Sequence, residues 1–145
     1  MLKVDEPRRY KMFEAISRTD GSLRRFVPVK SESTESLVVL FVEISADSNS
    51  SLDLDKADIK LDLGDHKLVA PATETGEELS ESSEFRTRAM FGRWKYLLDD
   101  HVSLGAGEKA TGYVIYRVDA GSTVRAIQFG DDGTTRWEFG TTEID

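Results

Sequence analysis

The hydrophobic positions along the chain follow the pattern of short β-strands separated by polar turns. Residues 37–44 are almost continuously apolar and rich in β-branched side chains, so they predict a central strand covered on both faces. The small polar residues at 45–51 predict the loop that ends this strand. Upstream, residues 10–16 and 24–30 predict the first two strands, with a turn between them.

Residues 59–69 alternate between apolar and polar side chains, which predicts a β-hairpin with one dry and one wet face. Gly64 and Asp65 fit a two-residue type II′ turn at the tip of this hairpin. In the register that such a turn sets, Leu61 lies opposite Leu68 on the apolar face.

The last third of the chain carries further strand and turn signals. Residues 112–118 and 124–129 have strand patterns and are joined by a turn at 119–122, which predicts that they pair as a hairpin. Residues 134–139 predict a final strand. Residues 93–98 fit either a strand or a short helix.

These elements predict one all-β domain over residues 1–145. Seven to nine short strands, with turns at this spacing, are typical of an immunoglobulin-like antiparallel β-sandwich, and no helix is required. The polar and acidic segment 71–83 has little to bury, so we expect a long mobile loop there. A chain of 145 residues is large enough to bury a core without disulfides or a structural metal.

Charge and composition exclude several classes of function. The net charge of -8 creates a field that repels phosphate backbones, so no nucleic-acid partner is expected. This acidity suits either an ordinary soluble protein or one of halophilic origin. The absence of cysteine removes disulfides, thiolate nucleophiles and cysteine-ligated metals. No apolar run approaches the length of a membrane span.

The inventory of catalytic side chains points away from an enzyme. His66 and His101 are the two histidines of the chain, and no serine lies in a Gly-x-Ser-x-Gly elbow. We therefore expect no catalytic residues, no cofactor and no enzymatic activity.

A transition-metal site is one candidate. Asp99, Asp100 and His101 offer oxygen and nitrogen ligands within three residues, and His66 or Met90 would complete a copper or zinc site if folding brought them close. The alternative interpretation is a solvated acidic turn with a surface histidine.

Calcium is a second candidate ligand, because it prefers clustered carboxylate oxygens. Aspartates concentrate at residues 53–58 and 131–132, but the glycine and the distant glutamate of an EF-hand loop are missing. Strand or turn aspartates that face water explain the same residues.

Aromatic residues form the third candidate site. Trp94 and Trp137, with Tyr96, Tyr113 and Tyr116, would provide a flat platform for stacking sugar rings if they lay on one exposed face. The alternative is that these large side chains belong to the core.

Two blocks of the sequence resemble a family of bacterial and archaeal extracytoplasmic domains of unknown function. The first block is the strand at residues 36–44, a polar loop, and the strand that runs from Asp58 into the turn at Gly64. The second block is residues 104–118, where a Gly-Glu turn and a short spacer lead into an aromatic-alternating strand. Ala106 departs from the family pattern, in which proline is common before the Gly-Glu pair.

The resemblance implies an immunoglobulin-like fold similar to that of telokin and of the mycobacterial immunoprotective secreted antigen. It also implies a location outside the cytoplasm, and it brings no catalytic residues. The N-terminal residues show no signal peptide, so a secreted or lipid-anchored location requires a signal or anchor that was removed from a precursor. The resulting hypothesis is a non-enzymatic module for protein interaction or surface display, with another protein at the cell surface as its partner. The alternative is a ligand-binding carrier for a metal ion or a carbohydrate.

Overall fold

The structure is a computed structural model that describes residues 2–5, 7–10, 13–17, 23–26, 35–64, 67–72, 96–130 and 135–139. Within these ranges the chain forms twelve strands and one 3-10 turn, and the strands pair antiparallel. The domain is therefore an all-β sandwich, as predicted. The strands outnumber the seven to nine expected because several are only two or three residues long, too short to leave a pattern.

No helix in the described part of the chain has the length and apolar character needed to cross a membrane.

The first sheet is built around the strand predicted from the apolar run. Its members are β1 (Leu2–Val4), β2 (Arg8–Tyr10), β5 (Glu35–Ser45) and β10 (Lys109–Asp119). β10 pairs with β5 along its whole length, and β1 and β2 share the opposite side of β5. Residues 37–40 of β5 are all buried, so this part of the strand is covered on both faces as predicted.

The outer edge of this sheet is interrupted near Pro7, which lies between β1 and β2. Val4 pairs with Val42 and Arg8 pairs with Val39, so the edge gains one residue relative to β5, as in a β-bulge. Prolines and bulges at an edge hinder pairing with other chains. The interruption leaves two short pieces of strand instead of one long edge.

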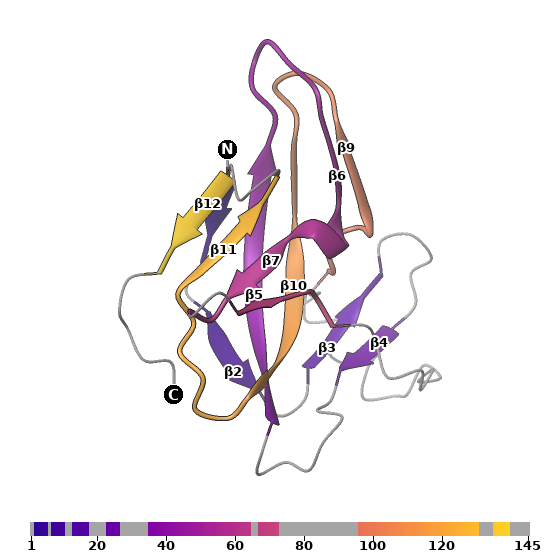
Figure 1. Ribbon diagram of the computed structural model, residues 1–145. Helices are drawn as coiled ribbons and strands as arrows, with labels where there is room; N and C mark the ends of the chain where they lie inside the picture. The colour runs from indigo at the N-terminus through magenta and orange to yellow at the C-terminus, as the bar shows by residue number, and fades with distance from the viewer. Residues whose placement is uncertain are drawn as a thin grey trace.

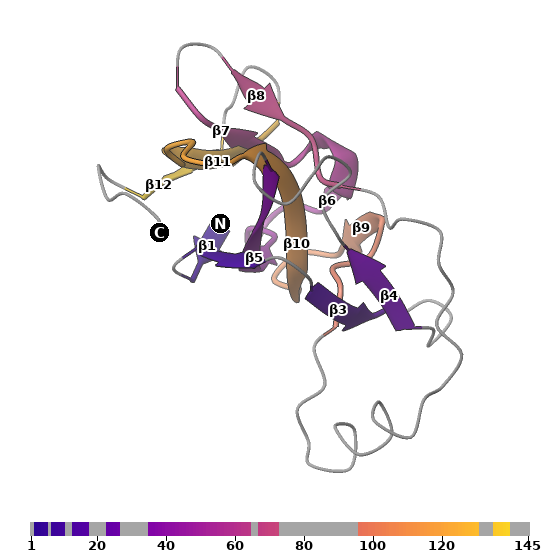
Figure 2. The same ribbon diagram turned by 90° about the horizontal axis from the view of Figure 1, so that it is seen from below.

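The second sheet faces the first across the core, and Figure 2 shows the two layers. Its strands lie in the order β12 (Thr135–Glu138), β11 (Ala126–Phe129), β7 (Lys60–Asp62) and β8 (Leu68–Val69). The predicted hairpin between residues 112–118 and 124–129 is wrong, because β10 and β11 belong to different sheets. The turn at 119–122 forms as predicted but carries the chain across the sandwich. The much longer ladder that β10 makes with β5 outweighs the local pairing.

The hairpin of β7 and β8 forms, but its register differs from the prediction by one residue. Leu61 pairs with Val69, and the N–H of Leu63 donates to the carbonyl of Lys67 at 2.9 Å, so three residues separate the paired positions instead of two. A shift of one residue turns every side chain to the other face. Val69 consequently packs against the core, and Leu68 is left 49% exposed.

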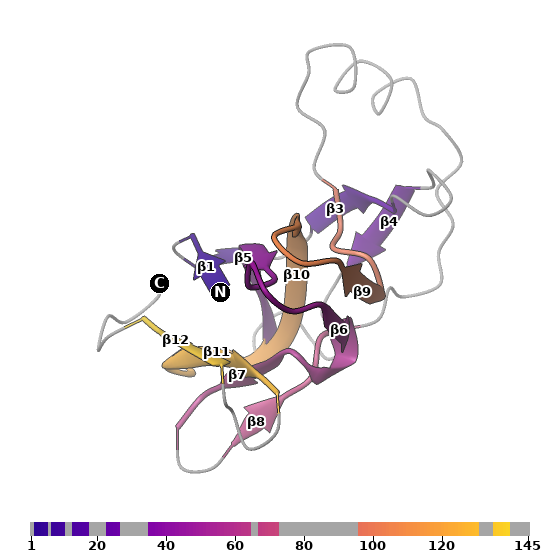
Figure 3. The same cartoon turned by 90° about the horizontal axis from the view of Figure 1, so that it is seen from above.

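Two strand pairs flank the sandwich. They are β3 (Phe13–Ile16) with β4 (Leu23–Phe26), and β6 (Leu52–Asp55) with β9 (His101–Leu104). The 3-10 turn η1 (Lys56–Asp58) links β6 to β7, so the chain passes from the first sheet to the second through β6. The ribbon of β6 and β9 lies on the opposite side of the domain from β1 and β12 (Figures 1 and 3). The strand predicted at residues 10–16 is divided between β2 and β3.

The segment at residues 96–98 ties β3 to β10. Tyr96 and Leu97 form isolated parallel bridges with Ile16 and Tyr113, which supports the extended interpretation of this segment. Its backbone crosses β10 at Gly112, where a Cβ atom would lie 2.4 Å from the amide nitrogen of Leu98. The rest of the predicted element at 93–98, and the predicted loop at 71–83 beyond residue 72, lie outside the described residues.

The apolar side chains form two clusters on opposite faces of β5 and β10. The larger cluster fills the space between the two sheets, and Leu98 belongs to it. The smaller cluster lies on the other face, where Phe13, Phe26 and Leu97 cover Leu37. Segment 96–98 therefore contributes one leucine to each cluster, and its position on Gly112 matters to both.

Candidate functional site

His101, the central residue of the predicted metal site, lies on the exposed face of β9. Buried and exposed side chains alternate along β6 and β9, so Leu54 and Val102 point into the core while Asp53, Asp55 and His101 face solvent. The register pairs Asp55 directly with His101. His101 Nδ1 lies 2.6 Å from Asp55 Oδ1, and His101 Nε2 lies 2.5 Å from Asp53 Oδ1. Both ring nitrogens thus face carboxylates of the neighbouring strand.

These carboxylates stabilise the charged form of the ring. The hydrogen bond with Asp55, followed by that with Asp53, raises the pKa of His101 above its ordinary value. His101 is well exposed, so solvent weakens each of these interactions. Part of this arrangement is visible in the sequence, because Asp53 and Asp55 alternate with apolar residues along β6, and His101 precedes the same kind of alternation along β9. The pairing of the two strands is not visible, because Asp55 and His101 lie 46 positions apart along the chain.

Asp99 and Asp100, the other two predicted metal ligands, lie exposed just before β9. Asp100 Oδ1 lies 3.1 Å from the ammonium of Lys56, which also donates to the carbonyl of Leu98 at 3.1 Å. The side chains of Asp100 and His101 are thus engaged by different elements. Among the residues that the structure covers, no group of three or more potential ligands is arranged to hold a metal ion.

Several residues of the other candidate sites fall outside the described ranges. These are His66 and Met90, which were expected to complete the metal site, and the aspartates at 131–132. Asp53, Asp55 and Asp58 are exposed, as water-facing strand or turn aspartates are expected to be.

The aromatic residues proposed for a sugar platform are divided among different faces. Tyr116 lies in the core, where its hydroxyl donates to the carbonyl of Ile59 at 2.7 Å and burial raises its pKa well above the ordinary value. Tyr113 lies on the opposite face of β10, in ring contact with Phe13 and Phe41. Trp94 lies outside the described residues.

Among the aromatic residues that the structure describes, Trp137 stands out by its exposure to solvent. It lies on β12, opposite the buried Ile127 of β11, and is 36% exposed. It borders an open hollow of about 470 Å³ at the side of the domain where β12 approaches β1. The hollow is lined by Leu2, Lys3, Val4, Asp5, Phe41, Glu43 and Trp137. Apolar side chains and a large ring therefore line this hollow together with charged side chains of both signs.

Two long ion pairs join Glu43, which lines this hollow, to lysines beside it. Glu43 projects from the first sheet between two lysines, with Oε2 at 3.9 Å from Lys3 Nζ and Oε1 at 3.6 Å from Lys109 Nζ. Exposed pairs of this length contribute little to stability. They leave charges of both signs available for a ligand or partner.

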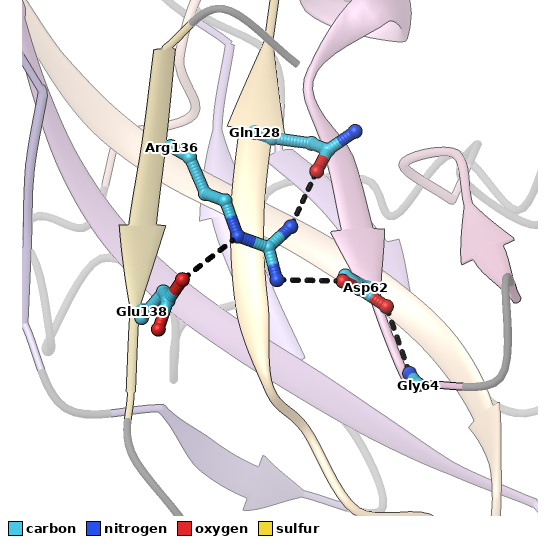
Figure 4. A network of polar contacts seen from close by, with 5 residues as sticks. All are labelled: Asp62, Gly64, Gln128, Arg136 and Glu138. Carbon is cyan, nitrogen blue, oxygen red and sulfur yellow. Dashed lines mark hydrogen bonds and ion pairs between the residues drawn. The ribbon is translucent and has the colours of Figure 1, made fainter. Parts of the chain in front are cut away.

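A polar network covers the outer face of the second sheet (Figure 4). The guanidinium of Arg136 on β12 donates to Gln128 Oε1 at 2.5 Å, to Asp62 Oδ2 at 2.8 Å and to Glu138 Oε1 at 3.3 Å. Asp62 also accepts the N–H of Gly64 at 2.8 Å. Partial burial opposes ionisation of Asp62, but the bonds from Gly64 and Arg136 outweigh it and lower its pKa. The network joins three strands, and it could not be predicted from the sequence because Asp62 on β7 lies 74 positions before Arg136 along the chain.

Comparisons of the chain with protein-family models, curated proteins and solved structures find no match. The resemblance to an extracytoplasmic immunoglobulin-like family stays a prediction. Two surface features of the domain could carry a function: the hollow at Trp137 and the cluster around His101.

Proposed function

We propose that the protein is a non-enzymatic, immunoglobulin-like binding module that acts outside the cytoplasm and engages another protein through the hollow beside Trp137. The observation that carries this proposal is the exposure of Trp137 where β12 approaches β1. Tryptophan is enriched among the residues that dominate the affinity of protein interfaces, because it buries a large rigid surface and retains a polar N–H.

The surroundings of Trp137 support a protein partner. Leu2 and Val4, which are themselves largely buried, line the hollow together with the charged side chains of Lys3, Asp5 and Glu43. Protein interfaces combine an aromatic residue with polar and charged side chains in this way. The interruption of the neighbouring edge near Pro7 disfavours extension of the sheet by a partner strand, so recognition would rest on side chains.

Carbohydrate binding is a second candidate function for the same hollow. An indole ring beside the carboxylates of Asp5 and Glu43 offers both a stacking face and hydrogen-bond acceptors for a sugar. This alternative predicts a small soluble ligand, whereas the leading proposal predicts a macromolecular partner.

Site-specific photo-crosslinking tests the leading proposal. A benzophenone amino acid is placed at Asp5, which lines the hollow and leaves Trp137 in place, and at Gln128 on the outer face of the second sheet as the control. We expect a discrete crosslinked protein from the cell envelope at position 5 but not at position 128. Excess wild-type domain should suppress the product, and the Trp137→Ala domain should not. Identical products at both positions would overturn the proposal.

Two further measurements test the carbohydrate alternative and the location outside the cytoplasm. In a Trp94→Phe background, Trp137 is the remaining tryptophan, and quenching of its fluorescence by a glycan would favour the carbohydrate function. Fractionation of cells that express the protein naturally tests the location, and recovery of the protein with the cytoplasm would contradict it.

A further inference from the structure

The protonation state of His101 decides whether its ring can satisfy both carboxylates. A neutral imidazole has one N–H donor and one acceptor lone pair, whereas an imidazolium has two donors. Asp55 faces Nδ1 and Asp53 faces Nε2, each within hydrogen-bonding distance. Only the protonated ring therefore donates to both, and loss of the proton sets a nitrogen lone pair against one carboxylate.

From this geometry we infer that Asp53, Asp55 and His101 form a pH-sensitive clasp that fastens β6 to β9 when His101 is protonated and loosens it when the proton leaves. In the closed state one cation bridges two like charges that stand two residues apart on β6. In the open state those two carboxylates face each other across a neutral ring, and one hydrogen bond is lost.

The other charged groups near the ribbon do not replace this interaction. Asp100, which directly precedes His101, is engaged by the ammonium of Lys56, and Asp99 lies one residue further away. The opposite face of β9 turns Val102 and Leu104 into the core and reaches β10 through apolar contacts. In the described part of the chain, the charges that face His101 are therefore the two aspartates of β6.

The ribbon is positioned so that its fastening affects more than these three residues. β6 is the crossover between the two sheets, and Leu54 packs into the larger core cluster. Two backbone hydrogen bonds join the segment that leads into β6 to the turn that follows β9. Ala46 N–H donates to the carbonyl of Glu108 at 2.9 Å, and Gly107 N–H donates to the carbonyl of Asp47 at 3.0 Å. Opening of the clasp is thus expected to loosen this end of the domain before the domain unfolds as a whole.

The direction of the pH dependence follows from the raised pKa of His101. Because the folded pKa lies above the ordinary value of 6.5, the clasp contributes fully to stability below about pH 6.5. Its contribution is lost as the pH rises through the folded pKa. A fall in pH through the folded pKa of His101 therefore tightens the ribbon.

An NMR titration of the two histidine rings tests the clasp, with His66→Gln used to assign the signals. We expect Asp53→Asn and Asp55→Asn each to lower the pKa of His101, and the double variant to lower it further. Asp99→Asn removes the same charge from a nearby position that lacks the contact, and it should leave the pKa almost unchanged. Equal effects of all three single variants would reduce the interaction to general electrostatics and overturn the proposal.

Amide hydrogen exchange gives an independent measurement of the ribbon itself. Protection factors of Leu54 and Val102, corrected for the intrinsic pH dependence of exchange, should rise as the pH falls through the pKa of His101 in the wild type. His101→Gln should abolish this rise without affecting amides of β11. If the rise survived in His101→Gln, the clasp would not be what fastens β6 to β9.

Discussion

Gly112 lies where the backbone of segment 96–98 crosses β10, and Gly112→Ala is expected to destabilise the domain strongly. A Cβ atom at this position would lie 2.4 Å from Leu98 N, 2.5 Å from Leu98 Cα and 2.8 Å from the carbonyl carbon of Leu97. These are backbone atoms, so no side-chain rotation relieves the overlap. The segment would have to move away from β10.

The cost can be worked from the contacts that such a movement breaks. Overpacking of a core costs about 1 to 3 kcal/mol. Leu98 N–H donates to the carbonyl of Tyr113 at 3.0 Å, and Tyr113 N–H donates to that of Tyr96 at 2.8 Å. Each of these backbone hydrogen bonds contributes about 1 kcal/mol. The total is about 3 to 5 kcal/mol, which corresponds to a fall in Tm of about 10 °C or more for a domain of this size.

Urea unfolding followed by circular dichroism measures this change, and Gly107→Ala is the matched control. Gly107 has φ of 78° in an exposed turn, and no atom lies within 4 Å of its Cβ position. Its substitution should cost about 1 kcal/mol, from backbone conformation alone. A Gly112→Ala domain within 1 kcal/mol of the wild type would show that segment 96–98 does not depend on its close approach to β10.

Three further outcomes are expected from the buried and polar contacts. Tyr116→Phe should destabilise the domain by about 1 to 3 kcal/mol in urea unfolding, because it leaves the buried carbonyl of Ile59 without its donor; a neutral effect would mean that water takes the place of the hydroxyl. Arg136→Gln should cost about 1 kcal/mol, measured as a lower Tm, because it removes the charge that joins β7, β11 and β12. Asp62 contributes stability above its ordinary pKa of 3.8 that is lost as the pH falls through its lowered folded value. Acid titration of Asp62→Asn should lack this loss, and an unchanged acid profile would contradict it.

The sequence predicted the positions of strands, which depend on local patterns, better than it predicted which strands pair with each other. The apolar run at residues 37–44 identified β5, and alternation around Leu61 identified the face it buries. The predicted hairpin register was wrong because nothing in the sequence distinguishes a two-residue loop from a three-residue loop that begins at Gly64. The assumed pairing of β10 with β11 failed because proximity along the chain is a weak guide when a longer partner exists.

The surface sites follow the same rule. The exposure of His101 was one of two alternatives open from the sequence, but its contact with Asp55 depends on the pairing of β6 with β9. The exposure of Trp137 depends on β12 lying at the end of its sheet, next to β1. Residue types therefore identified the candidates, and only the topology showed which side chains surround each of them.

The pairing of β5 with β10 also governs how the domain forms as the chain is synthesised. β5 carries the long apolar run at residues 37–42, yet its long partner emerges only after residue 119 has been translated. Contacts between such distant segments are slow to form, because a large loop has to close first. Until then, β5 presents an unpaired apolar edge, which chaperones recognise and which promotes aggregation. The strand at the centre of the first sheet is thus a segment prone to aggregation while the chain is being synthesised.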